Sequence, residues 1–367
     1  MRITTKPWTV AGAATALVAF HANSVAASVG GPDAAAASPI ITYDDVPANR
    51  IGELETSIGF YQAIELAENS LLFSKQSKYQ DIEVHKSKFY GKILVLDGVI
   101  QVTERDADSY NEMMAHIPMF QHPNPKRVLI VGGGDGYVLK EVLKHHSVEH
   151  VDHVDLDEDV IHTCEEYFPQ WGDAWKDPRA FLHICDGAQF VRDAADGTYD
   201  VIIQDSSDPF VVGEDGTMTT LPSAALYEED HICQLHRILK PNGILNIQGE
   251  SFNVPTSLGG IISWRRNMEA CGFKRTRYGS IMTSSYPTGQ IGLLLGEKEP
   301  SLSADYASVS RRYREMISNE KKTTYYHPPL QKGCFELPLW AHENIYGSED
   351  TSDLLCDNWQ TIDTKDS

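Results

Sequence analysis

The chain comprises 367 residues, of which 41% are hydrophobic and 23% charged, and it carries a formal net charge of −21. This composition is typical of a globular protein of two or three domains, and it excludes a disordered chain, a collagen-like fibre and a polytopic membrane protein. The acidic balance argues against nucleic-acid binding, because a negative surface repels phosphate groups, and it favours plain solubility or cationic partners.

Residues 1–44 differ in composition from the rest of the chain. A basic start with Arg2 and Lys6 precedes an apolar stretch from Trp8 to Phe20 and then a region of small residues. This order is typical of a secretory signal, whereas the scarcity of acids and the many Ser, Thr and Ala residues also fit an organelle transit peptide. An Ala-rich extension without a targeting role is the third interpretation. The apolar stretch is too short for a membrane span, so we expect no membrane association once the leader is removed, and the compartment stays open.

Residues 48–120 are expected to form a small antiparallel β domain with a connecting helix. Alternation of polar and apolar residues and short apolar runs predict strands, and Asp97-Gly98 is a typical hairpin turn. These strands are predicted at 79–84, 93–96 and 99–102. Apolar residues then recur at helical spacing over 106–120, and Pro118 is expected to mark the end of this helix.

From residue 121 to 298 apolar strands alternate with helices. The continuous apolar run Val128–Val131 is typical of a parallel strand that is covered on both faces. Further strands are predicted at 148–156, 181–185, 201–203, 243–247 and 291–295, with helices at 137–145, 158–168, 188–194, 226–239 and 261–271. We therefore predict an α/β fold: a Rossmann-like, doubly wound parallel sheet of the methyltransferase type, preceded by the small antiparallel β domain. Residues 299–367 are expected to be a C-terminal extension with a short final helix and an acidic tail.

The six cysteines form no recognisable metal or redox motif. None belongs to a CxxC pair or stands near His at zinc-finger spacing, and most lie in apolar runs. We therefore expect buried free thiols and no metal site at Cys164, Cys185, Cys233, Cys271, Cys334 and Cys356.

A glycine-rich loop, Gly132-Gly133-Gly134-Asp135-Gly136, follows the first strand of the predicted parallel sheet and precedes a helix. Glycines at this place allow a tight turn and a close approach of the backbone to a ligand. Because Asp135 stands inside the loop, it would repel a pyrophosphate and suits a cationic ligand, such as a sulfonium or an amine. A purely structural tight turn is the alternative interpretation.

Acidic residues also stand where the next three strands are expected to end. These are Asp155, Asp186 beside Gly187, and Asp205 in the segment Asp205–Pro209. In open α/β sheets the ligand crevice lies at the carboxyl ends of the strands, and an acid after the second strand binds ribose hydroxyls. Asp186 can accept from an exocyclic amine such as that of adenine, although Asp155 alone also fits a solvated acid. Together the acids predict an adenosine group with positive charge and a basic co-substrate.

With these motifs the chain resembles the spermidine synthase (polyamine aminopropyltransferase) family over about residues 48–298. The matching segments are Phe89–Lys92, Leu96–Gln101, Thr103–Asp106, Ser109-Tyr110, Gly132–Gly136, Leu156–Val160, Asp205–Pro209, Gln248–Glu250 and Ser285–Gly292. The resemblance implies transfer of an aminopropyl group from decarboxylated S-adenosylmethionine to putrescine, with release of methylthioadenosine. It implies no metal and no cofactor beyond this co-substrate, a small diamine as the other partner, and a homodimer or homotetramer.

The resemblance also assigns roles to residues of this chain. The acceptor amine attacks only when neutral, so a carboxylate that takes its proton fits the chemistry, and Asp205 matches the family's general base. The implied donor-binding residues are Gln80, Asn111, Gly132, Gly134, Asp135, Asp155, Asp186 and Gly187. The implied acceptor-binding residues are Tyr110, Asp208, Tyr286, Gln248 and Glu250. Without the resemblance, Tyr110 also fits a core position, Tyr286 a turn aromatic, and Gln248 and Glu250 the wall of the crevice.

Three positions depart from the family pattern. Asn111 replaces the usual Gln or His, Tyr137 replaces a small residue after the glycine loop, and the link from Phe210 to Ala225 is about ten residues longer than usual. The longer link is expected either to alter the preference for acceptor length, as a lid over the site, or to be an inert insertion. The alternatives to a spermidine synthase are a putrescine N-methyltransferase, a spermine or thermospermine synthase, and a non-catalytic polyamine-binding homologue.

Overall fold

The computed structural model describes residues 49–55, 59–207, 209–212, 218–220, 222–319 and 321–347. The predicted leader, the acidic tail beyond residue 347, Asp208 and part of the long link after it lie outside the described residues. Within the described part, no helix is both long and apolar enough to cross a membrane.

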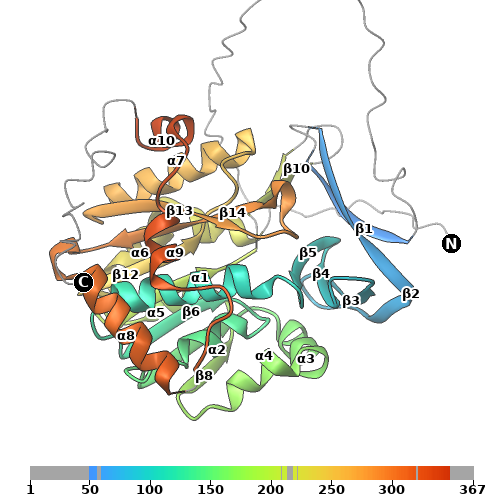
Figure 1. Ribbon diagram of the computed structural model, residues 1–367, viewed down its shortest axis with the longest axis horizontal. Helices are drawn as coiled ribbons and strands as arrows, with labels where there is room; N and C mark the ends of the chain where they lie inside the picture. Colours follow the sequence, from blue (N-terminus) through green and yellow to red (C-terminus); the bar gives the residue numbers. More distant parts are fainter. Residues whose placement is uncertain are drawn as a thin grey trace, which may run out of the picture. The chain divides into compact units, whose positions relative to one another are not determined.

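The N-terminal part is a five-stranded antiparallel sheet in the order β1-β2-β3-β4-β5 (Figure 1). The three predicted strands are present, and two more precede them. The sequence pattern is strand-like from about residue 49, but it did not place the long strand β2, whose alternation is broken. The pairing of β2 with β3 shifts register between Leu66 and Phe73, and Asn69 has a positive φ of 51°. The strands are β1 (Arg50–Glu55), β2 (Phe60–Gln76), β3 (Asp81–Ser87), β4 (Lys92–Leu96) and β5 (Val99–Thr103).

Helix α1 (Ala107–Gln121) connects this sheet to the rest of the chain. The prediction that Pro118 ends the helix is wrong, because α1 continues through it. Pro118 has no N–H to donate to the carbonyl oxygen of Met114, and the side-chain Nδ2 of Asn246 donates to that oxygen instead, at 2.9 Å. A buried amide from a neighbouring strand thus replaces the missing backbone hydrogen bond.

The central sheet has seven strands in the order β13-β14-β12-β9-β6-β7-β8. Five of them, β6, β7, β8, β9 and β12, are parallel, which confirms the Rossmann-like fold. The expectation that the strand at 291–295 is also parallel is wrong, because β14 runs antiparallel to β12 and to the unpredicted β13. The link from β13 to β14 is a short loop, which joins antiparallel neighbours and is too short for a parallel crossover.

The strands and helices of this part have the following bounds: β6 (Arg127–Gly132), α2 (Tyr137–Val142), β7 (His150–Asp155), α3 (Glu158–Tyr167), α4 (Pro169–Gly172), β8 (Ala180–Ile184), α5 (Gly187–Asp193), β9 (Tyr199–Asp205), β10 (Phe210–Val212), β11 (Met218–Thr220), α6 (Glu229–Ile238), β12 (Leu239–Gln248), α7 (Pro255–Ala270), β13 (Arg275–Met282) and β14 (Gln290–Glu297). Successive residues of β6 point to opposite faces of the sheet and pack in two different hydrophobic cores. Val128 and Ile130 pack with α1, α2 and α8, whereas Leu129 and Val131 pack with α5, α6, α7 and α10.

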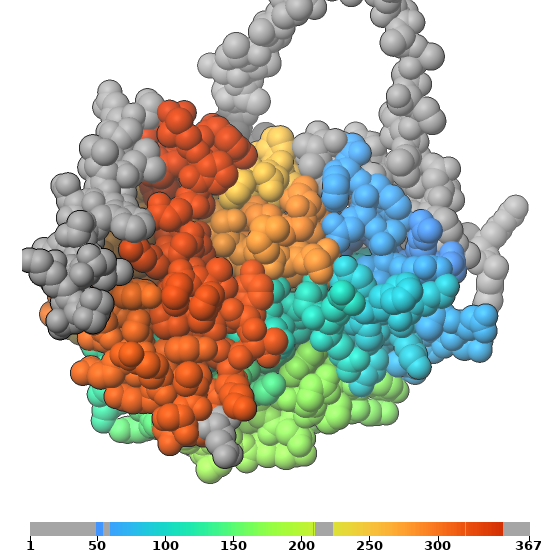
Figure 2. All heavy atoms as spheres, in the orientation of Figure 1, coloured from blue at the N-terminus to red at the C-terminus, as the bar shows by residue number. Residues whose placement is uncertain are grey.

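The C-terminal residues form α8 (Tyr306–Ser318), α9 (Pro328–Gly333) and α10 (Leu339–Tyr346). Val309 and Met316 of α8 belong to the same core as α1, and Ala341 and Ile345 of α10 belong to the core of the opposite face. The C-terminal segment from α8 to α10 as a whole, orange to red in Figure 2, forms a large part of the visible surface. The short final helix was predicted from the sequence, and α8 and α9 were not.

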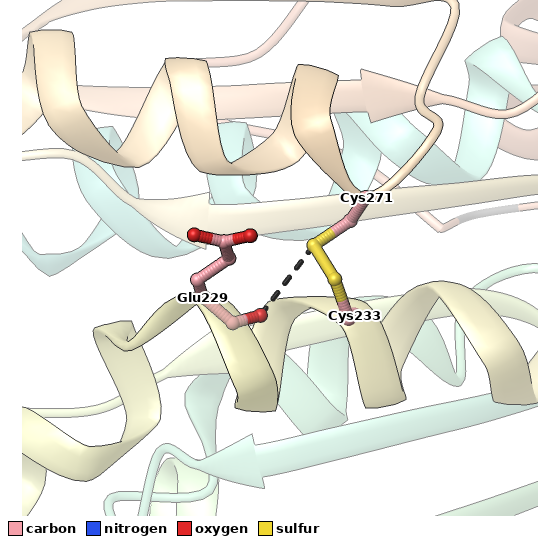
Figure 3. Close-up of a disulfide and its surroundings, with 3 residues drawn as sticks. All are labelled: Glu229, Cys233 and Cys271. Carbon is pink, nitrogen blue, oxygen red and sulfur yellow. Dashed lines mark hydrogen bonds between the residues drawn. A yellow bond between two sulfur atoms is a disulfide. The ribbon is translucent and has the colours of Figure 1, made fainter.

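Cys233 in α6 and Cys271 at the C-terminal end of α7 form a disulfide, with their Cα atoms 4.8 Å apart (Figure 3). The prediction of free thiols is therefore wrong for this pair. It holds for Cys164 and Cys334, which are free and buried, while Cys185 is free but exposed. Cys356 lies outside the described residues. The pairing depends on the packing of α6 against α7, which spacing along the chain does not reveal.

Candidate functional site

A cavity of 520 Å³ opens at the carboxyl ends of β6, β7 and β9, with α1 and β5 contributing to its wall. Every predicted site residue that the structure describes lines it. On the predicted donor side these are Gln80, Asn111, Gly132, Gly134, Asp135, Asp155, Asp186 and Gly187, and on the predicted acceptor side Tyr110, Asp205, Gln248, Glu250 and Tyr286. Asp208 lies outside the described residues.

The glycine loop packs directly against the end of β9. Gly132 and Gly133 have φ values of 80° and 69°, and the N–H of Gly133 donates to the carbonyl oxygen of Asp205 at 2.7 Å. A Cβ atom on Gly132 would collide with that same carbonyl oxygen. The glycines are therefore needed both for the left-handed backbone and for the close approach that brings Asp135 and Asp205 to one cavity.

Asp135 is a half-buried carboxylate just before the start of α2. The N–H of Tyr137 donates to its Oδ1 at 2.8 Å. Burial and the nearby charge of Asp205 raise the pKa of Asp135 to about 7, against the Tyr137 hydrogen bond, which lowers it. A positive ligand charge beside Asp135 would favour its ionised form.

Asp155 is the last residue of β7 and Asp186 follows β8, and each accepts a backbone hydrogen bond from the segment after it. Oδ1 of Asp155 accepts from the N–H of Asp157 at 2.9 Å, and burial raises the pKa of Asp155 to about 6. Oδ1 of Asp186 accepts from the N–H of Gln189 at 3.0 Å and so caps α5. A Cβ atom on Gly187 would lie 2.8 Å from Val131, so glycine is needed for close packing here.

Asp205 and Tyr110 form the best-defined polar pair in the cavity. The Tyr110 hydroxyl donates to Oδ1 of Asp205 at 2.6 Å. Burial raises the pKa of Asp205 and the Tyr110 hydrogen bond lowers it, with a net pKa of about 6. The pKa of Tyr110 lies well above its ordinary value, because of burial and the charge of Asp205. Tyr110 therefore stays protonated, and Asp205 is predominantly ionised at neutral pH.

Tyr286 and Glu250 meet on the other side of the cavity. Tyr286 lies in the loop between β13 and β14, and its hydroxyl donates to Oε2 of Glu250. The loop is held by Asp106, a cavity residue to which the sequence assigned no role. The carboxylate of Asp106 accepts from the N–H of Ser285 at 2.6 Å and from the hydroxyl of Ser284 at 2.7 Å. Its place in the matching segment Thr103–Asp106 was the one available signal.

The wall of the cavity is rich in carboxylates. Among the described residues that line it there is no Lys, Arg or His. Carboxylates that lie close together repel one another when ionised, and a ligand that brings positive charge stabilises their ionised forms. The lining carboxylates are Glu53, Asp97, Asp106, Asp135, Asp155, Asp157, Asp186, Asp205 and Glu250.

Two of the departures from the family pattern have a defined place. Nδ2 of Asn111 donates to the carbonyl oxygen of Ala107 at 3.0 Å, and its buried Oδ1 has no partner in the described part of the chain, so it can accept from a ligand. Tyr137 does not line the cavity. Its ring stacks on Trp171 at 5.0 Å, and its hydroxyl donates to Asp108 of α1. Of the long link, residues 210–212 and 218–220 form the hairpin β10–β11, and residues 222–225 begin a 3-10 helix (Pro222–Tyr227), from which Ser223 and Ala225 line the cavity.

Comparison with known proteins identifies the family. Residues 107–306 match the Spermine/spermidine synthase domain, and residues 53–104 match the Spermidine synthase tetramerisation domain. The chain is 38% identical to the spermidine synthase of Schizosaccharomyces pombe over 284 residues, covering 77% of this chain and 90% of the relative. It is 37% identical to a spermine synthase of Saccharomyces cerevisiae over 290 residues, covering 77% and 91%.

Solved structures agree with the sequence comparison. A crystal structure of a spermidine synthase with the transition-state analogue AdoDATO matches with a TM-score of 0.71 and 30% identity, covering 81% of this chain and 94% of that one. The spermidine synthase of Thermotoga maritima matches with a TM-score of 0.70 at the same identity and coverage. The chain therefore belongs to the spermidine/spermine synthase family of aminopropyltransferases.

Proposed function

We propose that this protein is a spermidine synthase, which transfers the aminopropyl group of decarboxylated S-adenosylmethionine to putrescine and releases methylthioadenosine. The observation that carries the proposal is a cavity lined by carboxylates without a cationic residue among its described lining, in which Asp205 accepts from Tyr110. Both substrates are cationic and contain no carboxylate, which suits such a wall.

On the donor side, each acid has a chemical partner in the nucleoside. Asp155 accepts from ribose hydroxyls and Asp186 from the adenine amine, with Gly187 leaving room for the base. Asp135 faces the sulfonium and the ammonium of the aminopropyl tail. Gln80 and Asn111 supply carbonyl oxygens that accept hydrogen bonds from the donor. Gly132 and Gly134 let the loop approach the ligand. A carboxylate on the donor, as in intact S-adenosylmethionine, would meet these acids and be repelled.

The reaction is an in-line displacement. The neutral amine nitrogen of putrescine attacks the methylene carbon bound to sulfur, the new C–N bond forms, and the C–S bond breaks with its electron pair going to sulfur. Asp205 takes the proton that the amine loses. Tyr110 and Tyr286 lie along the diamine, and Gln248, Glu250 and Asp208 bind its nitrogens. Holding the two substrates in line supplies much of the acceleration.

The match of residues 53–104 to a tetramerisation domain supports an oligomer, which we propose to be a homodimer or homotetramer. Light scattering of the purified full-length protein distinguishes these two states. A monomer at micromolar concentration would contradict the proposal.

Product analysis by mass spectrometry tests the activity. The full-length protein is given decarboxylated or intact S-adenosylmethionine, each with putrescine or spermidine. Spermidine and methylthioadenosine from the decarboxylated donor and putrescine are expected. Methylputrescine from the intact donor would indicate an N-methyltransferase, spermine or thermospermine a longer acceptor, and no product with any pair a binding protein.

The general base is tested by Asp205→Asn. An amide cannot take the proton of the attacking amine, so kcat is expected to fall by at least about a hundredfold. Asp193→Asn, a change of an exposed acid on α5, is the matched control and is expected to keep wild-type kinetics. A less than threefold loss in Asp205→Asn would exclude the role of Asp205.

A further inference from the structure

Asp157 is a buried acid that connects the two sheets beside the donor side of the cavity. Only 3% of its surface is exposed. Its Oδ1 accepts from the N–H of Asp159 at 3.1 Å and caps α3. Its Oδ2 accepts from the hydroxyl of Ser77 at 2.6 Å and from Nε2 of Gln80 at 3.0 Å, both in the loop between β2 and β3.

These contacts define which end of the Gln80 amide meets Asp157. The Ser77 oxygen accepts from the N–H groups of Tyr79 and Gln80, each at 3.0 Å, so its one proton goes to Asp157. An ionised carboxylate accepts hydrogen bonds and donates none. Gln80 must therefore turn its amide nitrogen toward Asp157, which leaves its carbonyl oxygen as the end that faces a ligand in the cavity.

The backbone of Asp157 holds a second acceptor in the same place. Its N–H donates to Oδ1 of Asp155 at 2.9 Å. One residue thus orients the carboxylate of Asp155 through its main chain and the carbonyl oxygen of Gln80 through its side chain. Two neighbouring acceptors suit a ligand with two neighbouring hydroxyl donors, which is the chemistry of a ribose diol.

We propose that Asp157 is a positioning residue for donor specificity: it fixes the Gln80 amide so that the enzyme presents only acceptors to the ribose hydroxyls. The proposal rests on the proposed function, because it takes the donor to be a nucleoside. Asp157 itself needs no contact with the substrate. Without the carboxylate of Asp157, the amide of Gln80 is free to rotate. In part of the molecules its NH₂ group, and not its carbonyl oxygen, then faces the ribose hydroxyl.

A reversal of polarity tests this arrangement. Asp157→Asn retains a good helix cap, because Asn and Asp cap equally well. With its oxygen at the cap, its NH₂ group faces Gln80 and selects the carbonyl end of that amide, which turns the NH₂ group of Gln80 toward the ligand. The KM for the donor is expected to rise about tenfold, with kcat and the KM for putrescine changed less than threefold. Gln80→Glu alone places two carboxylates together and is expected to raise the donor KM more.

The double variant, Asp157→Asn with Gln80→Glu, restores a defined pair. The new side-chain amide at position 157 donates to one oxygen of the new carboxylate at position 80, and the other oxygen faces the ligand as an acceptor. The donor KM is expected to return to within about threefold of wild type. A purely structural role of Asp157 in capping α3 predicts no such recovery, so a double variant as poor as the worse single one would overturn the proposal.

Calorimetric binding of methylthioadenosine gives a readout that does not require turnover. The affinity is expected to fall about tenfold in Asp157→Asn, and a deoxyribose analogue is expected to bind the variant and wild type equally. Equal affinity of both proteins for methylthioadenosine would overturn the proposal. If the protein binds the nucleoside in this way but makes no spermidine, the proposed activity fails and the role of Asp157 stands.

Two further variants complete the design. Ser77→Ala removes one of the contacts of Asp157 and is expected to raise the donor KM in the same direction, which keeps the proposal testable if Asp157→Asn does not fold. Asp305→Asn changes another helix-capping acid, whose Oδ1 accepts from the N–H of Ser308 at 2.7 Å on α8. This control is expected to keep the wild-type donor KM.

Discussion

The hydrogen bond from Tyr110 to Asp205 controls the charge of the proposed base. Burial alone would keep Asp205 protonated at higher pH, and the donated hydrogen bond stabilises its ionised form. The result is a carboxylate with a pKa of about 6, high enough to accept a proton well and low enough to be ionised at pH 7. One hydroxyl thus serves both to orient Asp205 and to set the pH at which it acts.

Tyr110→Phe is expected to move the acidic limb of the pH profile. A base acts only when deprotonated, so kcat/KM for putrescine falls as the pH drops below the pKa of Asp205. Loss of the hydrogen bond raises that pKa and shifts the limb to higher pH, which lowers kcat/KM at pH 7. The measurement is kcat/KM across the acidic and neutral pH range at saturating donor.

The chain offers a matched control for this shift. The hydroxyl of Tyr199 donates to Oδ2 of Asp152 at 2.9 Å, in a buried pair outside the cavity. Tyr199→Phe is expected to leave the limb where it is. A limb that stays in place or moves to lower pH in Tyr110→Phe would contradict the role of this hydrogen bond.

At the scale of elements, two helices that flank the cavity are joined by a covalent bond. The first residues of α7, such as Thr256 and Ser257, line the cavity, and the turn before α6 contributes Ala225 and Leu226. The disulfide between Cys233 and Cys271 fixes α6 against the far end of α7.

Removal of the disulfide is expected to lower stability more than activity. The bond closes a loop with a sequence separation of 38 residues, and loops of this kind contribute about 2–4 kcal/mol through the unfolded state. Cys233→Ser with Cys271→Ser should lower the melting temperature, and a reductant should lower that of the wild type but not of the variant. Intact-mass measurement after alkylation checks the bond directly, and two freely alkylated thiols at these positions in the unreduced protein would contradict it.

At the scale of the whole molecule, the C-terminal extension is fastened to the helix that carries Tyr110. The buried carboxylate of Glu112 on α1 accepts three backbone N–H groups, from Thr324 at 2.7 Å, Tyr325 at 2.8 Å and Tyr326 at 2.7 Å. Both oxygens of one side chain thus serve as acceptors for three successive backbone N–H groups. The extension is therefore part of the support of α1.

Glu112→Gln is expected to loosen this attachment. The amide supplies one acceptor oxygen and turns an NH₂ group toward backbone donors, so the free energy of unfolding should fall by about 2–4 kcal/mol. Denaturant unfolding measures the change. Glu315→Gln on the exposed side of α8 is the control, and an equal stability of both variants would contradict the role of Glu112.

Features that depend on interactions between residues close together in the sequence could be predicted, and features that depend on distant residues could not. The glycine loop, the acids at the ends of β6, β7, β8 and β9, and the parallel order of these strands follow from local patterns. Apolar runs indicate buried strands, and chain topology then places their carboxyl ends together. For this reason the predicted site residues that the structure describes all lie on the cavity wall, which also contains groups without a predicted role, such as Asp106 and Asp157.

Only the tertiary structure decided the features that depend on contacts between distant segments. The sequence by itself determined a Rossmann-like fold and an acidic nucleoside site, because hydrophobic period and turn chemistry are local. It did not reveal the antiparallel β13–β14 pair, the passage of α1 through Pro118, the disulfide, or the hydrogen bond of Asp157 to Gln80. The last three depend on a partner far along the chain, and the β13–β14 hairpin takes its place in the sheet through the pairing of β14 with β12. The positions of these partners exist only after the sheet and helices have packed.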